Sequence, residues 1–148
     1  MVERFERFSY AISEISRYWH KIASDEMEKY GLKSPHAIYL TTMYHYEDGL
    51  HAARLGELCG KDKSDVSRMM SIMEKKGLVK REGEGAYRAL LKLTDEGKRA
   101  AEHVRARAIV AVEAAGKGIT DENRQVFYDT LELIAANLAK ISAAGLPL

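Results

Sequence analysis

The part of the chain whose residue types best suit a chemical task is the stretch 62–76, where small polar residues and cations follow a helical spacing. Val66, Met69, Met70 and Met73 recur at i, i+3, i+4 and i+7, which predicts one apolar face. Short hydroxyl side chains let a helix approach DNA base edges closely, and an arginine can fork onto a guanine or a phosphate. The alternative is an ordinary amphipathic helix with a solvated face. The side chains off the apolar face are Lys63, Ser64, Ser67, Arg68, Ser71 and Lys75.

The distribution of charge agrees with a basic surface in the middle of the chain. The 148 residues carry 23 Lys and Arg against 22 Asp and Glu, a net charge of +1. Residues 51–99 alone carry 12 against 8, whereas both ends are mildly acidic. A local excess of this kind is a modest indication of a nucleic-acid surface, although it is also found on plain solvated faces.

The sequence contains none of the motifs that mark an enzyme or a metal site. It contains no nucleophile elbow, Walker loop, Rossmann glycine set or zinc motif, so we expect neither an enzyme nor a cofactor. The five histidines form no local pair with metal-ligand spacing, so no metal site is predicted. Cys59 is expected to be a buried small hydrophobe, with a redox switch as the alternative. No apolar run approaches the roughly 20 residues of a membrane span, and we expect a cytoplasmic protein without a membrane partner.

Two long helices with narrow apolar seams are predicted at the ends of the chain. The first runs from about Glu3 to Tyr30, and the last begins at Thr120, a residue suited to an N-cap. Spacings of three and four create a seam that packs along another helix. The two seams can pack on each other in a monomer or form the arms of an intertwined dimer, which we favour. The seams consist of Phe5, Phe8, Ile12, Ile15, Trp19 and Ile22, and of Phe127, Leu131, Ile134, Leu138 and Ile141.

The middle of the chain is predicted to hold four helices and a hairpin. Ser34 is expected to cap a helix whose first residue is Pro35. Asp62 is expected to cap another, with Asp65 three residues later as an approximate capping box. The sequence predicts helices over 35–46, 53–59, 63–76 and 94–116, and strands over 78–81 and 87–93. Without repeats or a linker, the prediction is one compact chain, mostly α with a small hairpin.

Three stretches of this sequence resemble MarR-family transcriptional regulators. Residues 55–79, LGELCGKDKSDVSRMMSIMEKKGLV, resemble the family's helix-turn-helix. LTDEG at 93–97 resembles its Leu-Thr-x-x-Gly junction after the wing, and LKSP at 32–35 resembles the start of its second helix. The resemblance covers nearly the whole chain in element order. It implies dimerisation helices over about 1–33 and 117–148, a winged helix-turn-helix over about 34–99 and a connecting helix over about 94–116.

The resemblance also implies what the protein does. Members of the family are dimers that usually repress transcription at pseudo-palindromic operators in double-stranded DNA, and many release DNA when a small molecule binds. We therefore expect a homodimeric, sequence-specific repressor released by a small aromatic or amphipathic ligand. The alternative is a dimeric small-molecule sensor or protein-interaction module of the same fold without strong DNA binding. Candidate ligand residues, in a pattern that is more often plain core, are Trp19, His20, Tyr39, Met43 and Tyr44.

The wing departs from the family pattern. Gly85 and Tyr87 stand where an Asp and an Arg are common, and Arg88 falls one residue later, on the opposite face of a strand. Glu82 and Glu84 at the tip would oppose phosphates. The full set of predicted DNA-binding residues is Lys61, Lys63, Ser64, Asp65, Ser67, Arg68, Ser71, Arg81 and Arg88.

Overall fold

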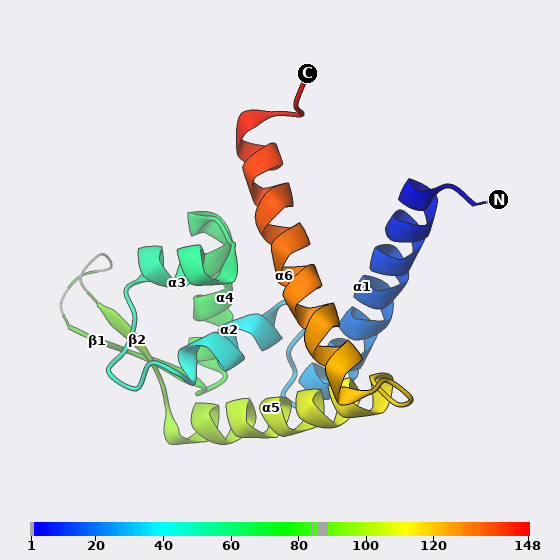
Figure 1. Cartoon of the computed structure of the whole chain (residues 1–148). Coiled ribbons are helices and arrows are strands. Elements are labelled where there is room, and N and C mark those ends of the chain that lie inside the picture. Colours follow the sequence, from blue (N-terminus) through cyan, green and yellow to red (C-terminus); the bar gives the residue numbers. More distant parts are fainter. Residues whose placement is uncertain (1, 84, 86–88) are drawn as a thin grey trace. The chain divides into compact units, whose positions relative to one another are not determined.

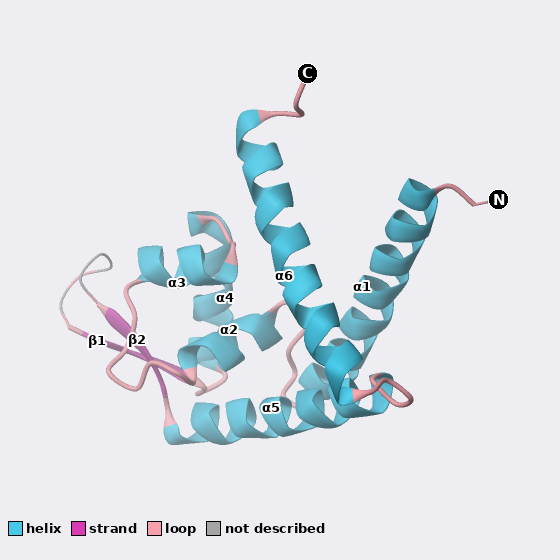
Figure 2. Cartoon of the chain, in the orientation of Figure 1, coloured by secondary structure: helices cyan, strands magenta, loops and turns pink. Residues whose placement is uncertain are grey.

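Helices dominate the structure, with one small antiparallel hairpin, and this confirms the predicted mostly α, winged helix-turn-helix class (Figures 1 and 2). The computed structural model describes residues 2–83, 85 and 89–148, and Arg88 lies outside the described residues. The chain divides into two compact units, 1–109 and 110–148. The elements are α1 (Arg4–Glu28), α2 (His36–Met43), α3 (Ala52–Cys59), α4 (Lys63–Lys75), β1 (Val79–Glu82), β2 (Leu90–Leu93), α5 (Asp95–Ala115) and α6 (Asp121–Ala144).

Two helix starts are held by the predicted side-chain caps. At α4, the Asp65 backbone N–H donates to Oδ1 of Asp62 at 2.8 Å. At α6, the backbone N–H of Asn123 donates to Oγ1 of Thr120 at 3.2 Å. Each cap satisfies one of the N–H groups that the first turn of a helix leaves without an intrahelical partner. Among the described helices, none has both the length and the apolar character needed to cross a membrane.

The start and end of α2 differ from the prediction. Pro35, and not Ser34, occupies the N-cap position, and no side chain caps this helix. Instead, the Lys33 backbone N–H donates to Nδ1 of the buried His36 at 3.0 Å. The helix ends at Met43 and not near 46, because residues 44–49 form turns that lead to an isolated bridge. That bridge pairs Leu50 with the hairpin.

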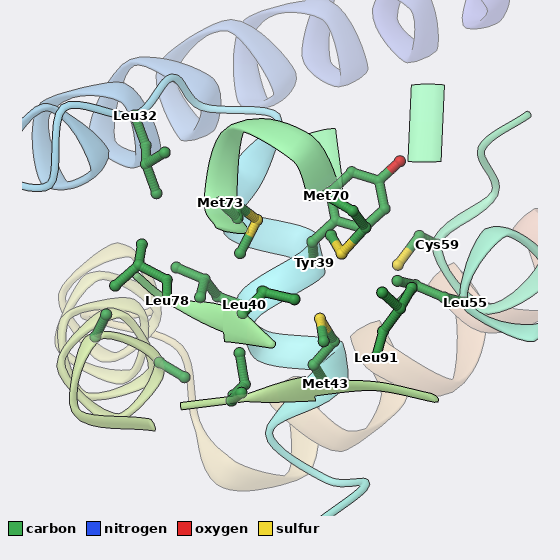
Figure 3. Packing of buried hydrophobic residues seen from close by; sticks show 14 of the residues in the cluster. Leu32, Tyr39, Leu40, Met43, Leu55, Cys59, Met70, Met73, Leu78 and Leu91 are labelled. Carbon is green, nitrogen blue, oxygen red and sulfur yellow. The ribbon is translucent and has the colours of Figure 1, made fainter. Parts of the chain in front are cut away.

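The core of residues 1–109 gathers around α2. Tyr39, Leu40 and Met43 point from this helix into a cluster that α4, the hairpin and α5 complete (Figure 3). Tyr39 and Leu40 are fully buried and Met43 is 3% exposed. Close packing of this kind holds α3 and α4 against α2 through side chains that cannot move independently. The other contributors include Met27, Leu32, Leu55, Val66, Met70, Met73, Leu78, Leu91, Ala100, Ala101 and Val104.

The hairpin pairs β1 with β2 and also binds the chain before α3. In the antiparallel register, Val79 lies opposite Leu93 and Arg81 opposite Leu91. Leu91 also exchanges two backbone hydrogen bonds with Leu50, of 2.8 and 3.0 Å. The first strand is shifted by one residue from the predicted 78–81. The second begins at Leu90, inside the predicted 87–93, and residues 86–88 lie outside the described part. The bridge at Leu50 fixes the base of the wing to the helix-turn-helix.

The junction between β2 and α5 depends on Thr94 and Gly97. The Thr94 hydroxyl donates to the Gly77 carbonyl at 2.6 Å and accepts from the Gly97 N–H at 3.0 Å, so it caps α5 and ties it to the segment before β1. Gly97 is buried, and a Cβ at this position would overlap the carbonyl oxygen of Leu78. The helix therefore approaches the backbone at Leu78 more closely than any side chain allows.

We expect Gly97→Ala to lower the free energy of unfolding by about 1–3 kcal/mol, because the clash is with backbone and outweighs the better helix propensity of alanine. Urea unfolding followed by circular dichroism measures this change. Gly116→Ala is the matched control, since a Cβ there meets only the flexible end of the Arg124 side chain. Equal effects of the two substitutions would contradict the importance of the close approach.

Candidate DNA-binding surface

The helix α4 separates an apolar inner face from a polar outer face, as its spacing predicts. Val66, Met70 and Met73 are at most 2% exposed, and Met69 is partly buried. The outer face carries the exposed residues Lys63, Ser64, Ser67, Arg68, Ser71 and Lys75. Small hydroxyl side chains and cations in the first turns match the requirements of a helix that enters the major groove.

A groove between α3, α4 and the hairpin brings several predicted DNA-binding residues together. It has a volume of about 560 Å³, and Lys61, Lys63, Ser67 and Arg81 line it. The buried side chains of Val66, Met70 and Leu91 also contribute to its wall. Residues that lie up to 20 positions apart in the sequence thus form one surface, with three cations on it.

Asp65 differs from the other predicted contacts because its side chain is only 20% exposed. The capping box is realised in part: the Asp65 N–H binds Asp62, but the Asp65 carboxylate binds Tyr39 and Arg68. The hydroxyl of Tyr39 and the guanidinium of Arg68 lower the pKa of the Asp65 carboxyl. Burial raises the pKa of Tyr39, and the Asp65 carboxylate adds to that effect. Asp65 is therefore ionised and Tyr39 neutral at physiological pH.

In the described part of the wing, the charged side chains of the two strands form ion pairs. The Arg81 Nε donates to Oε2 of Glu74 at 2.6 Å, which fastens the first strand to the end of α4. Glu82 lies 2.7 Å from the Lys92 ammonium and 3.7 Å from that of Lys80, and Lys92 is the main cause of its lowered pKa. A phosphate contact by Arg81 therefore has to compete with the Glu74 carboxylate.

A second cleft, of about 640 Å³, lies among α1, α2, the end of α3 and the part of α5 before residue 110. Trp19 and His20, two of the predicted ligand residues, line it. Met43 and Tyr44 line a separate cleft of about 220 Å³. Tyr39 is fully buried in the core cluster and lines neither cleft. The structure thus divides the predicted ligand residues among the larger cleft, the smaller cleft and the core.

Glu26, which the sequence did not single out, joins α1 to α5 at the wall of the larger cleft. Its Oε2 lies 2.6 Å from Nζ of Lys29 and 2.9 Å from Nε2 of His103, and its Oε1 accepts from Nε of Arg107 at 3.1 Å. The bonds from Lys29 and then His103 are the largest causes of a pKa lowered to about 2. The spacing of His103 and Arg107, which puts both on one side of a helix, was the available sequence signal.

Cys59 is 6% exposed at the end of α3 and also lines the larger cleft. Its Sγ lies 3.9 Å from the Ile38 carbonyl oxygen, and burial raises the pKa of the thiol. A raised pKa disfavours the thiolate on which redox sensing depends. Within the described parts of the chain, no three His, Cys, Asp or Glu side chains gather in a way that could hold a metal ion.

Comparisons with known proteins agree with this geometry. Residues 30–88, from the end of α1 through the helix-turn-helix to the hairpin, match the model of the MarR family. That stretch therefore carries the sequence pattern of the MarR family. A search of the curated proteins finds no match.

Solved MarR-type structures share the fold over nearly the whole chain. A MarR transcriptional regulator from Methanosarcina mazei is 24% identical, with a TM-score of 0.81 over 95% of this chain and 94% of its own. MepR from Staphylococcus aureus, solved as a DNA complex, is 18% identical, with a TM-score of 0.80 over 88% and 97%. CouR from Rhodococcus jostii, bound to p-coumaroyl-CoA, is 23% identical, with a TM-score of 0.72 over 86% and 91%.

The Glu26 cluster makes stability depend on pH. Because the folded pKa of about 2 lies below the ordinary value of 4.5, the ionised carboxylate stabilises the fold above about pH 4.5. That contribution declines as pH falls below 4.5 and disappears once pH passes about 2. We expect Glu26→Gln to unfold at lower urea concentration than the wild type at pH 7, and the difference to shrink between pH 4.5 and 3. Glu14→Gln, at an exposed position of the same helix, is the control. A difference independent of pH would contradict this assignment.

Proposed function

We propose that the protein is a homodimeric, sequence-specific DNA-binding repressor whose α4 helices enter successive major grooves of a pseudo-palindromic operator. The observation that carries the proposal is the outer face of α4, where Ser64, Ser67 and Arg68 are exposed above a fully packed inner face. Lys61 and Lys63 flank the start of the helix, where phosphates are also favoured by the backbone N–H groups. The MepR–DNA complex, which has the same fold, supports a DNA partner.

Homodimerisation is supported by the apolar seams of α1 and α6. Trp19 is 41% exposed, Ile15 58%, Phe127 46% and Leu138 48%, and α6 has no buried residue. A stripe of exposed large apolar side chains along a helix is typical of an interface. A second copy of the chain, with the same seams, offers the matching apolar faces.

Release by a small amphipathic ligand is supported by the cleft of about 640 Å³ beside α1, α2 and α5. Trp19, Ile22 and Ile38 supply apolar wall, and Lys61 and Arg105 supply positive charge. The same cleft touches Gly60 and Lys61 in the turn before α4. A ligand with an apolar body and an anionic group would therefore contact the turn that positions the recognition helix.

The alternative function is a dimeric sensor or protein-interaction module with weak DNA affinity. The pairing of Arg81 with Glu74 and the acidic Glu82 in the wing favour this alternative. A gel shift at several salt concentrations, on the DNA upstream of the protein's own gene, separates the two. Specific, salt-dependent binding supports the repressor, and its absence supports the sensor.

We expect Arg68→Ala to weaken operator binding by about 1–3 kcal/mol and to relax preference at one base pair per half-site. Lys63→Ala should instead weaken specific and random DNA alike and reduce the salt slope by about one unit for each phosphate that the side chain neutralises. Both effects should appear in two half-sites about 10 base pairs apart. Lys117→Ala, outside α4, is the control for removal of a positive charge. If Arg68→Ala weakens all sequences equally, Arg68 contacts phosphate and reads no base.

We expect the dimer not to separate without unfolding of helix. Trp19→Ala or Leu138→Ala should weaken it by about 2–5 kcal/mol if the partner buries that side chain fully. Analytical ultracentrifugation gives the dissociation constant, and circular dichroism on the same samples gives helix content. Ser24→Ala, off the seam of α1, should leave association unchanged. A folded monomer at micromolar concentration would exclude the obligate dimer.

A further inference from the structure

Asp65 lies in the first turn of α4, between a buried tyrosine and an exposed arginine. Its Oδ2 accepts a hydrogen bond from the Tyr39 hydroxyl, and its Oδ1 accepts one from Nη2 of Arg68 at 3.1 Å. The Asp65 side chain is 20% exposed and that of Arg68 is 64% exposed. One carboxylate therefore links the protein core to the side chain proposed to read a base.

The core holds the tyrosine end of this link in place. The ring of Tyr39 is fully buried in the cluster that contains Leu40 and Met70 (Figure 3). A ring packed in this way has little freedom to turn, so its hydroxyl is a fixed point from which to hold Asp65. The bond joins α2 to α4 across 26 positions of sequence. A phenylalanine would fill nearly the same volume, so the hydroxyl supplies the contact with Asp65 and little of the packing.

The arginine end needs such support. The Arg68 side chain is 64% exposed, so its contact with Asp65 adds little stability and is not explained as a stabilising feature of the fold. A free arginine side chain samples many rotamers, whereas bidentate recognition of guanine requires the guanidinium in one plane and one direction. Asp65 binds one nitrogen of the guanidinium and leaves other donors for a base edge.

We infer that Tyr39 and Asp65 are positioning residues that hold the Arg68 guanidinium in the orientation for reading one base pair. A hydroxyl in the core thereby contributes to sequence selectivity without touching DNA. This inference rests on the proposed function and adds to it the residues that set selectivity at one position. A purely structural role of Tyr39 would change stability, and affinity for all sequences together, without changing the preference at one base pair.

The test is selection from a random double-stranded DNA library, read by sequencing, with the full-length protein. The variants are Tyr39→Phe, Arg68→Ala and the double variant, beside the wild type. We expect Arg68→Ala to reduce preference at one base pair per half-site by about 5- to 150-fold. Tyr39→Phe should reduce preference at the same base pair by about 2- to 10-fold, the range of one hydrogen bond. In Tyr39→Phe, the affinity for random DNA and the salt slope should stay at their wild-type values. The double variant should show the same base preferences as Arg68→Ala.

Tyr30→Phe is the matched control, since Tyr30 is a partly buried tyrosine that packs against the same core from the end of α1. It should keep the wild-type preference. Asp65→Ala is the second variant, because it removes the carboxylate that accepts the hydrogen bond from Arg68. It should relax the same base pair, and it carries the test if Tyr39→Phe does not fold.

Unchanged preference in Tyr39→Phe, or an equal decrease on all sequences, would overturn the inference alone, provided that the wild type is selective and Arg68→Ala loses the preference at one base pair. A second change in the double variant, beyond that of Arg68→Ala, would also overturn it, because Tyr39 would then act through another residue. A wild type without selectivity would refute the proposed function and the inference together.

Discussion

Burial of α2 is the constraint on which the rest of residues 1–109 depends. A helix of eight residues that presents apolar side chains around most of its surface is stable only when other elements enclose it. In this protein α1, α3 and β2 pack on it, α4 is joined to it by the bond from Tyr39 to Asp65, and residues of α4 and α5 complete the cluster. The direction in which α4 presents its polar face therefore follows from packing around Tyr39 and Leu40.

Local signals in the sequence predicted most of the elements. Asp62 and Thr120 mark the starts of α4 and α6 because a side-chain cap depends only on residues within one turn. The limits of α2 were predicted less well. At its start, His36 accepts from the backbone of Lys33, a local contact that is not one of the usual capping patterns. Near its end, the bridge pairs Leu50 with Leu91, which no short window of sequence contains. Isolated bridges lack the alternation by which strands are recognised.

The outer face of α4 was predictable, but the partners of its residues were not. Periodicity identifies which side chains of α4 lie off its apolar stripe, but it cannot predict contacts between distant positions. Tyr39 bonds to Asp65 across 26 positions, and elsewhere in the fold Glu26 bonds to His103 across 77. The aromatic and sulfur-containing residues of α2 look alike whether they line a ligand cleft or fill a core. Only tertiary packing distinguishes Tyr39, which lies in the core, from Met43, which also lines the smaller cleft.

The contact between α5 and the backbone at Leu78 limits how this sequence can diverge. Every amino acid other than glycine has a Cβ, so each coding change at position 97 introduces the same overlap with the Leu78 carbonyl. No conservative replacement exists for that site, in contrast to the buried methionines of α4, for which other apolar residues of similar volume are tolerated. Substitution at position 97, where the wing joins α5, is therefore more restricted than substitution at those methionines.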